Sequence, residues 1–78
     1  MGVSIGYQIT VGKTHDITPG ARSHMYQIML DKGLIGLLDD TDLDLLEEAA
    51  KDDWVGEKFQ ILIDVIKKRG SVLTVCNF

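Results

Sequence analysis

The chain has 78 residues, 45% of them hydrophobic, and a formal net charge of −4. A chain of this length folds as one domain around one small core, and this one is too apolar to be disordered. No segment reaches the roughly 18 consecutive apolar residues of a membrane span. The lone cysteine, Cys76, excludes an internal disulfide. We therefore expect a folded cytoplasmic protein that does not associate with membranes.

A strand is predicted at the N-terminus. Along Val3–Val11, apolar residues alternate with small or polar ones, which is typical of a strand with one buried face. Gly12 and Lys13 then predict a turn. Thr14–Ile17 is a candidate second arm of a hairpin, although Asp16 weakens the strand pattern there.

The next residues predict a helix. Thr18 is the expected N-cap, and Pro19 occupies the first helical position, where its missing N–H costs nothing. The apolar residues that then recur at helical spacing are Ala21, Met25, Ile28 and Met29. Gly33 is the expected C-cap. The apolar residues 34–38 leave two alternatives, in which the helix continues through them or they form another turn.

A second, shorter helix is predicted after residue 40. Thr41 would cap it, with Asp44 three residues later in the capping-box position. Leu43, Leu46 and Ala50 would then face the core.

The longest helical pattern, Trp54–Arg69, is expected to be the central helix. One apolar stripe on it consists of Val55, Phe59, Leu62, Ile63 and Ile66. A second stripe beside the first consists of Trp54, Ile61 and Val65. The basic residues of the last turn lie where the helix dipole favours cations, and Gly70 follows as the expected C-cap.

Ser71–Asn77 predicts a second long strand, because β-branched residues are frequent in it and Gly70 precedes it. The predicted order of elements is β-α-α-α-β, in a single α+β domain over residues 1–78. The two terminal strands are expected to pair antiparallel and to pack on the central C-terminal helix.

The residues capable of catalysis do not form a recognised motif. His15 is adjacent to Asp16 in an expected loop, and Cys76 lies in an expected strand. These spacings predict no enzymatic activity, no metal site and no cofactor. Direct binding to nucleic acid is also not expected, because the helix dipole accounts for the basic run Lys67–Arg69 and acids precede the central helix.

Negative charge is concentrated in residues 39–57, which hold nine of the twelve acidic residues and one basic residue, Lys51. Several of these acids lie near helix starts, where the dipole stabilises them. Asp44, Glu47 and Glu48 instead place like charges three and four residues apart, at a cost of about 0.2–0.5 kcal/mol per pair. The predicted partner-binding residues are Asp39, Asp40, Asp44, Glu47, Glu48, Asp52, Asp53 and Glu57.

These features predict a small acidic protein that binds another protein, with an inhibitor of a basic nucleic-acid-binding surface as the leading hypothesis. The alternatives are an immunity or antitoxin-type protein, a structural subunit that uses the Trp54, Ile61 and Val65 stripe, and an anion-binding protein that uses the helix start Thr18–Ser23. That stripe and the uncovered strand edges also predict self-association as a homodimer.

Overall fold

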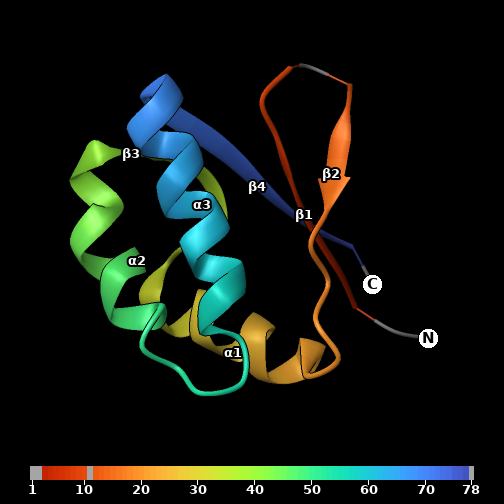
Figure 1. Cartoon of the computed structure of the whole chain (residues 1–78). Coiled ribbons are helices and arrows are strands. Elements are labelled where there is room, and N and C mark those ends of the chain that lie inside the picture. Colours follow the sequence, from red (N-terminus) through yellow and green to blue (C-terminus); the bar gives the residue numbers. More distant parts are fainter. Residues whose placement is uncertain (1–2, 11, 78) are drawn as a thin grey trace.

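The computed structural model describes residues 3–10 and 12–77, which form a four-stranded antiparallel sheet and three α-helices (Figure 1). The strand order is β2-β1-β4-β3, so the two terminal strands β1 and β4 are the central pair. The α+β class and this antiparallel pairing are confirmed. In chain order the elements are β1 (Ser4–Gln8), β2 (Thr14–Asp16), α1 (Arg22–Lys32), β3 (Gly36–Asp39), the 3-10 turn η1 (Asp40–Asp42), α2 (Leu43–Ala49), α3 (Gly56–Arg69) and β4 (Ser71–Asn77).

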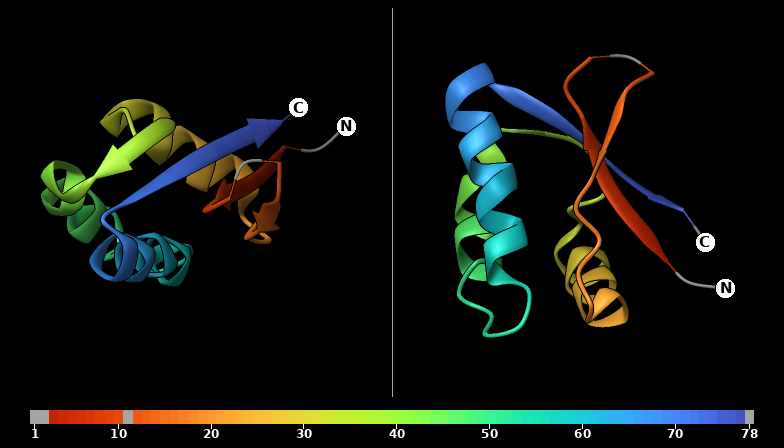
Figure 2. Two further views of the ribbon diagram at one scale, coloured as in Figure 1. Left: turned by 90° about the horizontal axis from the view of Figure 1, so that it is seen from above. Right: turned by 45° about the vertical axis from the view of Figure 1, so that its right-hand side comes forward.

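The helices gather on one side of the β1 and β4 pair (Figure 2). Alternation along the strands explains this arrangement, since Ile5 in β1 and Val72 and Thr74 in β4 are buried. On the opposite face, Leu37 of β3 is 74% exposed and pairs with Leu73 of β4. The sheet therefore has one face in the core and one largely open face.

Helix α3 is central, as predicted. Phe59, Leu62, Ile63 and Ile66 on its main stripe are buried, and α3 lies beside both α2 and β4. Together with Ile5 and the two buried methionines of α1, they belong to one continuous core cluster. Helix α3 therefore contributes more buried hydrophobic side chains to the core than any other element.

Residues 34–38 neither continue helix α1 nor form only a turn. Gly33 is the C-cap, as predicted, with φ of 68°, and strand β3 begins at Gly36. The buried hydroxyl of Thr74 donates to the Leu34 carbonyl at 2.7 Å and accepts the Gly36 N–H at 2.9 Å. These bonds fix the connection between α1 and β3 against β4. The sequence gives little signal for β3 because the strand is only four residues long.

The prediction of Thr18 as a helix N-cap is wrong, because α1 begins at Arg22 after Ala21. The Thr18 hydroxyl instead accepts the Ile5 N–H at 2.9 Å and bonds to the Asp16 carboxylate. Thr18, which follows β2, therefore ties the open end of the β1–β2 hairpin together by bonding to Ile5 of β1. The hairpin arm is confirmed over Thr14–Asp16, whereas Val11 lies outside the described residues.

The prediction of Thr41 as the cap of the second helix is also wrong. Asp39 instead caps the 3-10 turn η1, where its carboxylate accepts the Thr41 N–H at 3.0 Å, and the N-cap position of α2 is Asp42, which makes no side-chain capping bond to α2. Asp42 completes a reciprocal capping box by accepting the Asp39 N–H at 3.0 Å. A 3-10 turn therefore precedes α2, which begins at Leu43. The Asp39 carboxylate, and not the Thr41 hydroxyl, is the capping acceptor. An ionised acceptor forms stronger hydrogen bonds to the free amides of a helix start.

Replacement of Phe59 tests the central position of α3. The side chain is fully buried, so Phe59→Ala should lower the free energy of unfolding by about 3–5 kcal/mol, a large share of the stability of a small domain. Urea denaturation followed by circular dichroism measures the change. Leu37→Ala is the control, because that side chain is 74% exposed and its loss should cost about 0.5 kcal/mol or less. Equal effects of the two substitutions would contradict the core described here.

A second test concerns the close approach of α3 to the end of α2. A Cβ atom on Gly56 would lie 2.2 Å from the carbonyl oxygen of Ala50, whereas one on Gly20 would meet nothing within 4 Å. Gly56→Ala should therefore destabilise the protein by about 1–3 kcal/mol through overpacking, and Gly20→Ala should be neutral or slightly stabilising. Thermal melts of the two alanine variants provide the comparison, and a stable Gly56→Ala protein would show that this turn is not tightly packed.

Candidate functional site

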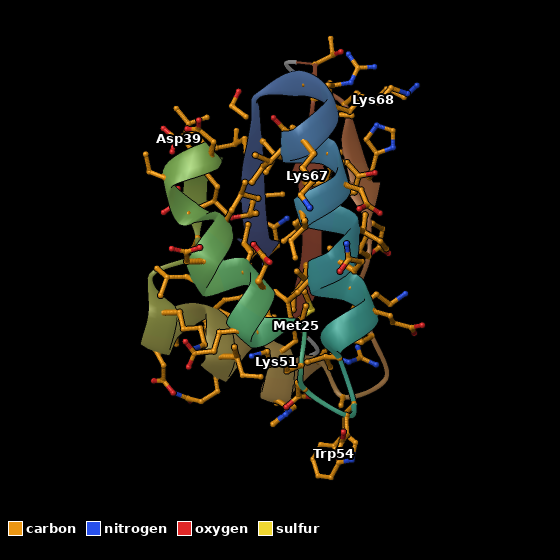
Figure 3. The ribbon with its side chains drawn as sticks, turned by 60° about the vertical axis from the view of Figure 1, so that its left-hand side comes forward. Met25, Asp39, Lys51, Trp54, Lys67 and Lys68 are labelled. Atoms are coloured by element: carbon orange, nitrogen blue, oxygen red, sulfur yellow. The ribbon has the colours of Figure 1, made fainter. Side chains whose placement is uncertain are left out.

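The acidic block extends along η1, α2 and the turn that leads into α3. In Figure 3 its first residue, Asp39, lies at the opposite end of the molecule from Trp54. On α2, Leu46 and Ala49 are buried, and the opposite surface carries the exposed residues Asp44, Glu47 and Glu48. The helix is therefore amphipathic, with its acids on the solvent side. The predicted inward orientation of Leu46 is confirmed.

Two of the predicted partner-binding acids have structural roles. Hydrogen bonds from the hydroxyl and the backbone N–H of Thr41 hold the pKa of Asp39 below its usual value. Asp52 accepts a hydrogen bond from His24 and further bonds from the backbone N–H groups of Trp54 and Val55, which together lower its pKa. Both carboxylates are ionised at neutral pH and are already satisfied within the fold.

The other predicted acids are open to solvent. Among the described residues, the side chains of Asp40, Asp44, Glu47, Asp53 and Glu57 have no hydrogen-bond or ion-pair partner. Glu48 forms an ion pair with Lys32 of α1 at 3.2 Å, and its own side chain is largely exposed. The structure thus divides the eight predicted acids into two that shape the backbone and six that face solvent. These six (Asp40, Asp44, Glu47, Glu48, Asp53 and Glu57) are called the acidic face below.

His24, Asp52 and Trp54 form a cluster near the N-terminal end of α3, which the sequence did not indicate. His24 Nε2 is 2.7 Å from Asp52 Oδ1, and the His24 ring meets Trp54 edge to face, with 4.9 Å between ring centroids. Because an ionised carboxylate only accepts, Nε2 carries the proton. The two partners lie 28 residues apart in the sequence, on segments that only the tertiary fold brings together.

The His24 and Asp52 pair resembles an oriented base, but its surroundings do not supply a nucleophile. The hollow beside it has a volume of about 250 Å³ and is lined by His24, Asp52, Asp53 and Trp54. No hydroxyl or thiol side chain belongs to that lining. The pair also positions Trp54, whose side chain is 72% exposed.

The second apolar stripe is not continuous, and this part of the prediction is wrong. Trp54 lies in the turn before α3, which begins at Gly56, so it cannot share a helix face with Ile61 and Val65. Ile61 and Val65 are half-buried and line a different hollow of about 270 Å³, together with Ile9, Asp64, Lys68 and Arg69.

The predicted anion site at Thr18–Ser23 contains an acid as well as a base. A hollow of about 510 Å³ is present there, lined by Val3, Ser4, Asp16, Thr18, Pro19, Gly20 and Arg22. Hydrogen bonds from the hydroxyl and backbone N–H of Thr18 lower the pKa of Asp16, so a carboxylate charge remains in the hollow at neutral pH. This charge opposes anions and offsets the attraction of Arg22.

Cys76 and His15 have ordinary structural surroundings. Burial raises the pKa of the Cys76 thiol, which disfavours the reactive thiolate. His15 stacks on Tyr7, with 5.0 Å between ring centroids. Within residues 3–10 and 12–77, no group of three or more metal-binding side chains is found. The same residues include no helix that is long and apolar enough to span a membrane.

Comparison with known proteins gives no relative from which a function could be transferred. No protein-family model matches the chain, and searches of curated proteins and of solved structures find no match. Function therefore has to be inferred from the surface of the chain itself.

The Asp52 cluster predicts a specific dependence of stability on pH. The folded pKa of Asp52 is depressed, so its contribution is present above the unfolded value of about 3.9 and is lost as pH falls through the folded pKa. Asp52→Asn should lower the melting temperature at pH 7, and its difference from the wild type should shrink below about pH 4. Asp53→Asn, which removes an exposed neighbouring charge, should change little at either pH. Thermal melts of the three proteins between pH 7 and pH 2 test this prediction. A difference in melting temperature between Asp52→Asn and the wild type that does not vary with pH would contradict a role for the Asp52 charge.

Proposed function

We propose that the protein is a non-enzymatic, protein-binding protein that meets a basic surface of its partner through the acidic face. The observation that carries this proposal is the exposed surface of α2, where Asp44, Glu47 and Glu48 project together and capping does not account for them. Folding gives no reason for Glu47 and Glu48, because like charges three and four residues from Asp44 destabilise a helix, whereas Asp44 itself lies in the first turn of α2, where the dipole favours an acid.

The acidic face receives little compensating charge from its surroundings. Lys32 pairs with Glu48, and Lys51 is the one basic residue in the sequence from 39 to 57. A field of one sign over a small surface accelerates association with an oppositely charged partner and raises specificity more than it raises affinity. The charge that is unfavourable in the free protein becomes favourable in the complex.

A nucleic-acid-binding surface on another protein has the required chemistry. Such surfaces present clustered Lys and Arg side chains to phosphates, and carboxylates on a rigid helix can pair with the same cations. In this proposal the protein acts as an inhibitor, because it occupies the basic surface of its partner in place of nucleic acid. The single free cysteine suits a reducing compartment such as the cytoplasm.

Reversal of one charge on the acidic face tests the proposal. A partner is first captured from a host lysate with the wild-type protein, identified and purified. Glu47→Lys should then reduce its affinity about tenfold, or about 1.4 kcal/mol, and should weaken the dependence of affinity on salt. The fold should be retained, because an exposed substitution of this kind changes stability by about 0.5 kcal/mol or less.

Asp31→Lys is the matched control for Glu47→Lys. Asp31 is an exposed acid on α1, outside the acidic face, and its replacement changes the net charge by the same amount. Affinity should therefore change much less in this variant. Equal losses in the two variants would show that overall charge, rather than the acidic face, drives binding, and tight binding of the wild type to a DNA column would exclude the acidic face as the contact.

A further inference from the structure

The side chain of Trp54 points outward from the turn before α3. Its side chain is 72% exposed, its backbone N–H donates to Asp52 at 2.9 Å, and its ring contacts the edge of His24. Exposed tryptophans of this kind are enriched among the residues that dominate protein interfaces, since they bury a large area at a low cost in conformational entropy. Asp53 lies beside it and is exposed. We call Trp54 with Asp53 the tryptophan tip.

A complementary hollow lies at the other end of α3. The apolar side chains of Ile9, Ile61 and Val65 line it, with the cations Lys68 and Arg69 at its edge. Its volume is about 270 Å³. These five residues are called the basic pocket.

The charges at the edge of the basic pocket are available for a partner. Among the described residues, Lys68 and Arg69 have no acidic partner within ion-pair distance. The one acid in the lining, Asp64, already accepts a hydrogen bond from the side chain of Gln60 at 3.0 Å. Asp64 keeps its negative charge while it accepts this bond, so the pocket combines apolar walls with two cations and one acid, an excess of one positive charge.

We propose that the tryptophan tip of one copy of the chain enters the basic pocket of a second copy. Figure 3 shows Trp54 beyond one end of α3 and Lys68 at the other, so the two surfaces cannot meet within one molecule. The indole would contact Ile61 and Val65, and Asp53 would approach Lys68 and Arg69. The tryptophan tip and the basic pocket are therefore complementary both in apolar surface and in charge.

The contact is head to tail, because the two participating surfaces are different. Each copy in such an arrangement keeps one unused tip or pocket, so association continues into a chain or closes into a ring. A single aromatic anchor gives a contact below the size of a standard interface, so assembly is weak and depends on protein concentration. The outer surface of α2 takes no part, and Asp53 is the one residue that this contact shares with the acidic face. Glu47→Lys therefore tests the proposed function without altering the tip or the pocket.

The fluorescence of Trp54 reports the contact directly, because it is the only tryptophan of the chain. Its emission should shift to shorter wavelength as the protein is concentrated from about 5 μM toward about 1 mM, the affinity range expected of weak contacts. Sedimentation velocity over the same range should show a parallel rise in mass. A monomer whose emission stays unchanged at the highest concentration would overturn the proposal.

Lys68→Glu and Lys67→Glu form a matched pair of variants. Both remove a cation from the last turn of α3, but only Lys68 lines the basic pocket, and the two side chains leave the helix in different directions (Figure 3). Lys68→Glu should lose the concentration-dependent shift, and Lys67→Glu should keep it. A shift that survives in Lys68→Glu would mean that Trp54 is buried against some other surface and would overturn the proposal.

A mixture of variants tests the direction of the contact. Trp54→Ala has an intact pocket but no tip, and Lys68→Glu has an intact tip but a blocked pocket, so each alone should remain monomeric. An excess of Trp54→Ala should restore the blue shift of Lys68→Glu, and the mass should stop at that of a dimer. Failure to restore the shift would rule out a tip-to-pocket contact, and growth beyond a dimer would rule out one tip and one pocket per chain.

Discussion

The carboxylate of Asp52 joins helix α1 to the entry of α3. One oxygen accepts from His24 of α1, and the other accepts two backbone N–H groups at the entry to α3. Gly56 completes the same turn, because it permits the backbone to pass close to the Ala50 carbonyl. This short turn therefore sets where α3 begins relative to α1 and to the end of α2. The outward direction of Trp54 is set by the same bonds.

The hydrogen bonds of Asp52 also show that the acids of the block do not all have the same role. Aspartates at the start of helical segments stabilise free amides, and Asp39 and Asp52 do so at the cost of their availability to a partner. Among the described residues, the carboxylates of Asp44 and Glu47 accept no hydrogen bond, and Asp44 acts on the fold only through its place in the first turn of α2. A single run of acids in the sequence therefore contains two physically different groups, and the hydrogen bonds to their carboxylates distinguish them.

Long patterns were predictable from the sequence, and single capping contacts were not. The stripe through Phe59 and Leu62 spans several turns, so its burial follows from periodicity alone. Thr18 and Thr41 satisfy the local rules for a cap, yet each bonds instead to an aspartate two residues earlier. The contact between His24 and Asp52 was invisible because it requires the packing of α1 against the turn before α3, and periodicity does not encode such distances.

The distribution of charge along α3 follows from its dipole, which favours Glu57 at the first turn and Lys67, Lys68 and Arg69 at the last. Any helix arranged in this way has ends of opposite charge, so charge alone cannot select one partner for its end. Selectivity at the ends of α3 has to come from shape and apolar contact. The exposed indole of Trp54 and the half-buried walls formed by Ile61 and Val65 supply these features. On α2 the charges act differently, because Asp44 repels Glu47 and Glu48, and Lys32 of α1 compensates Glu48 within the chain. Under the proposed function, a basic partner would offset the remaining repulsion.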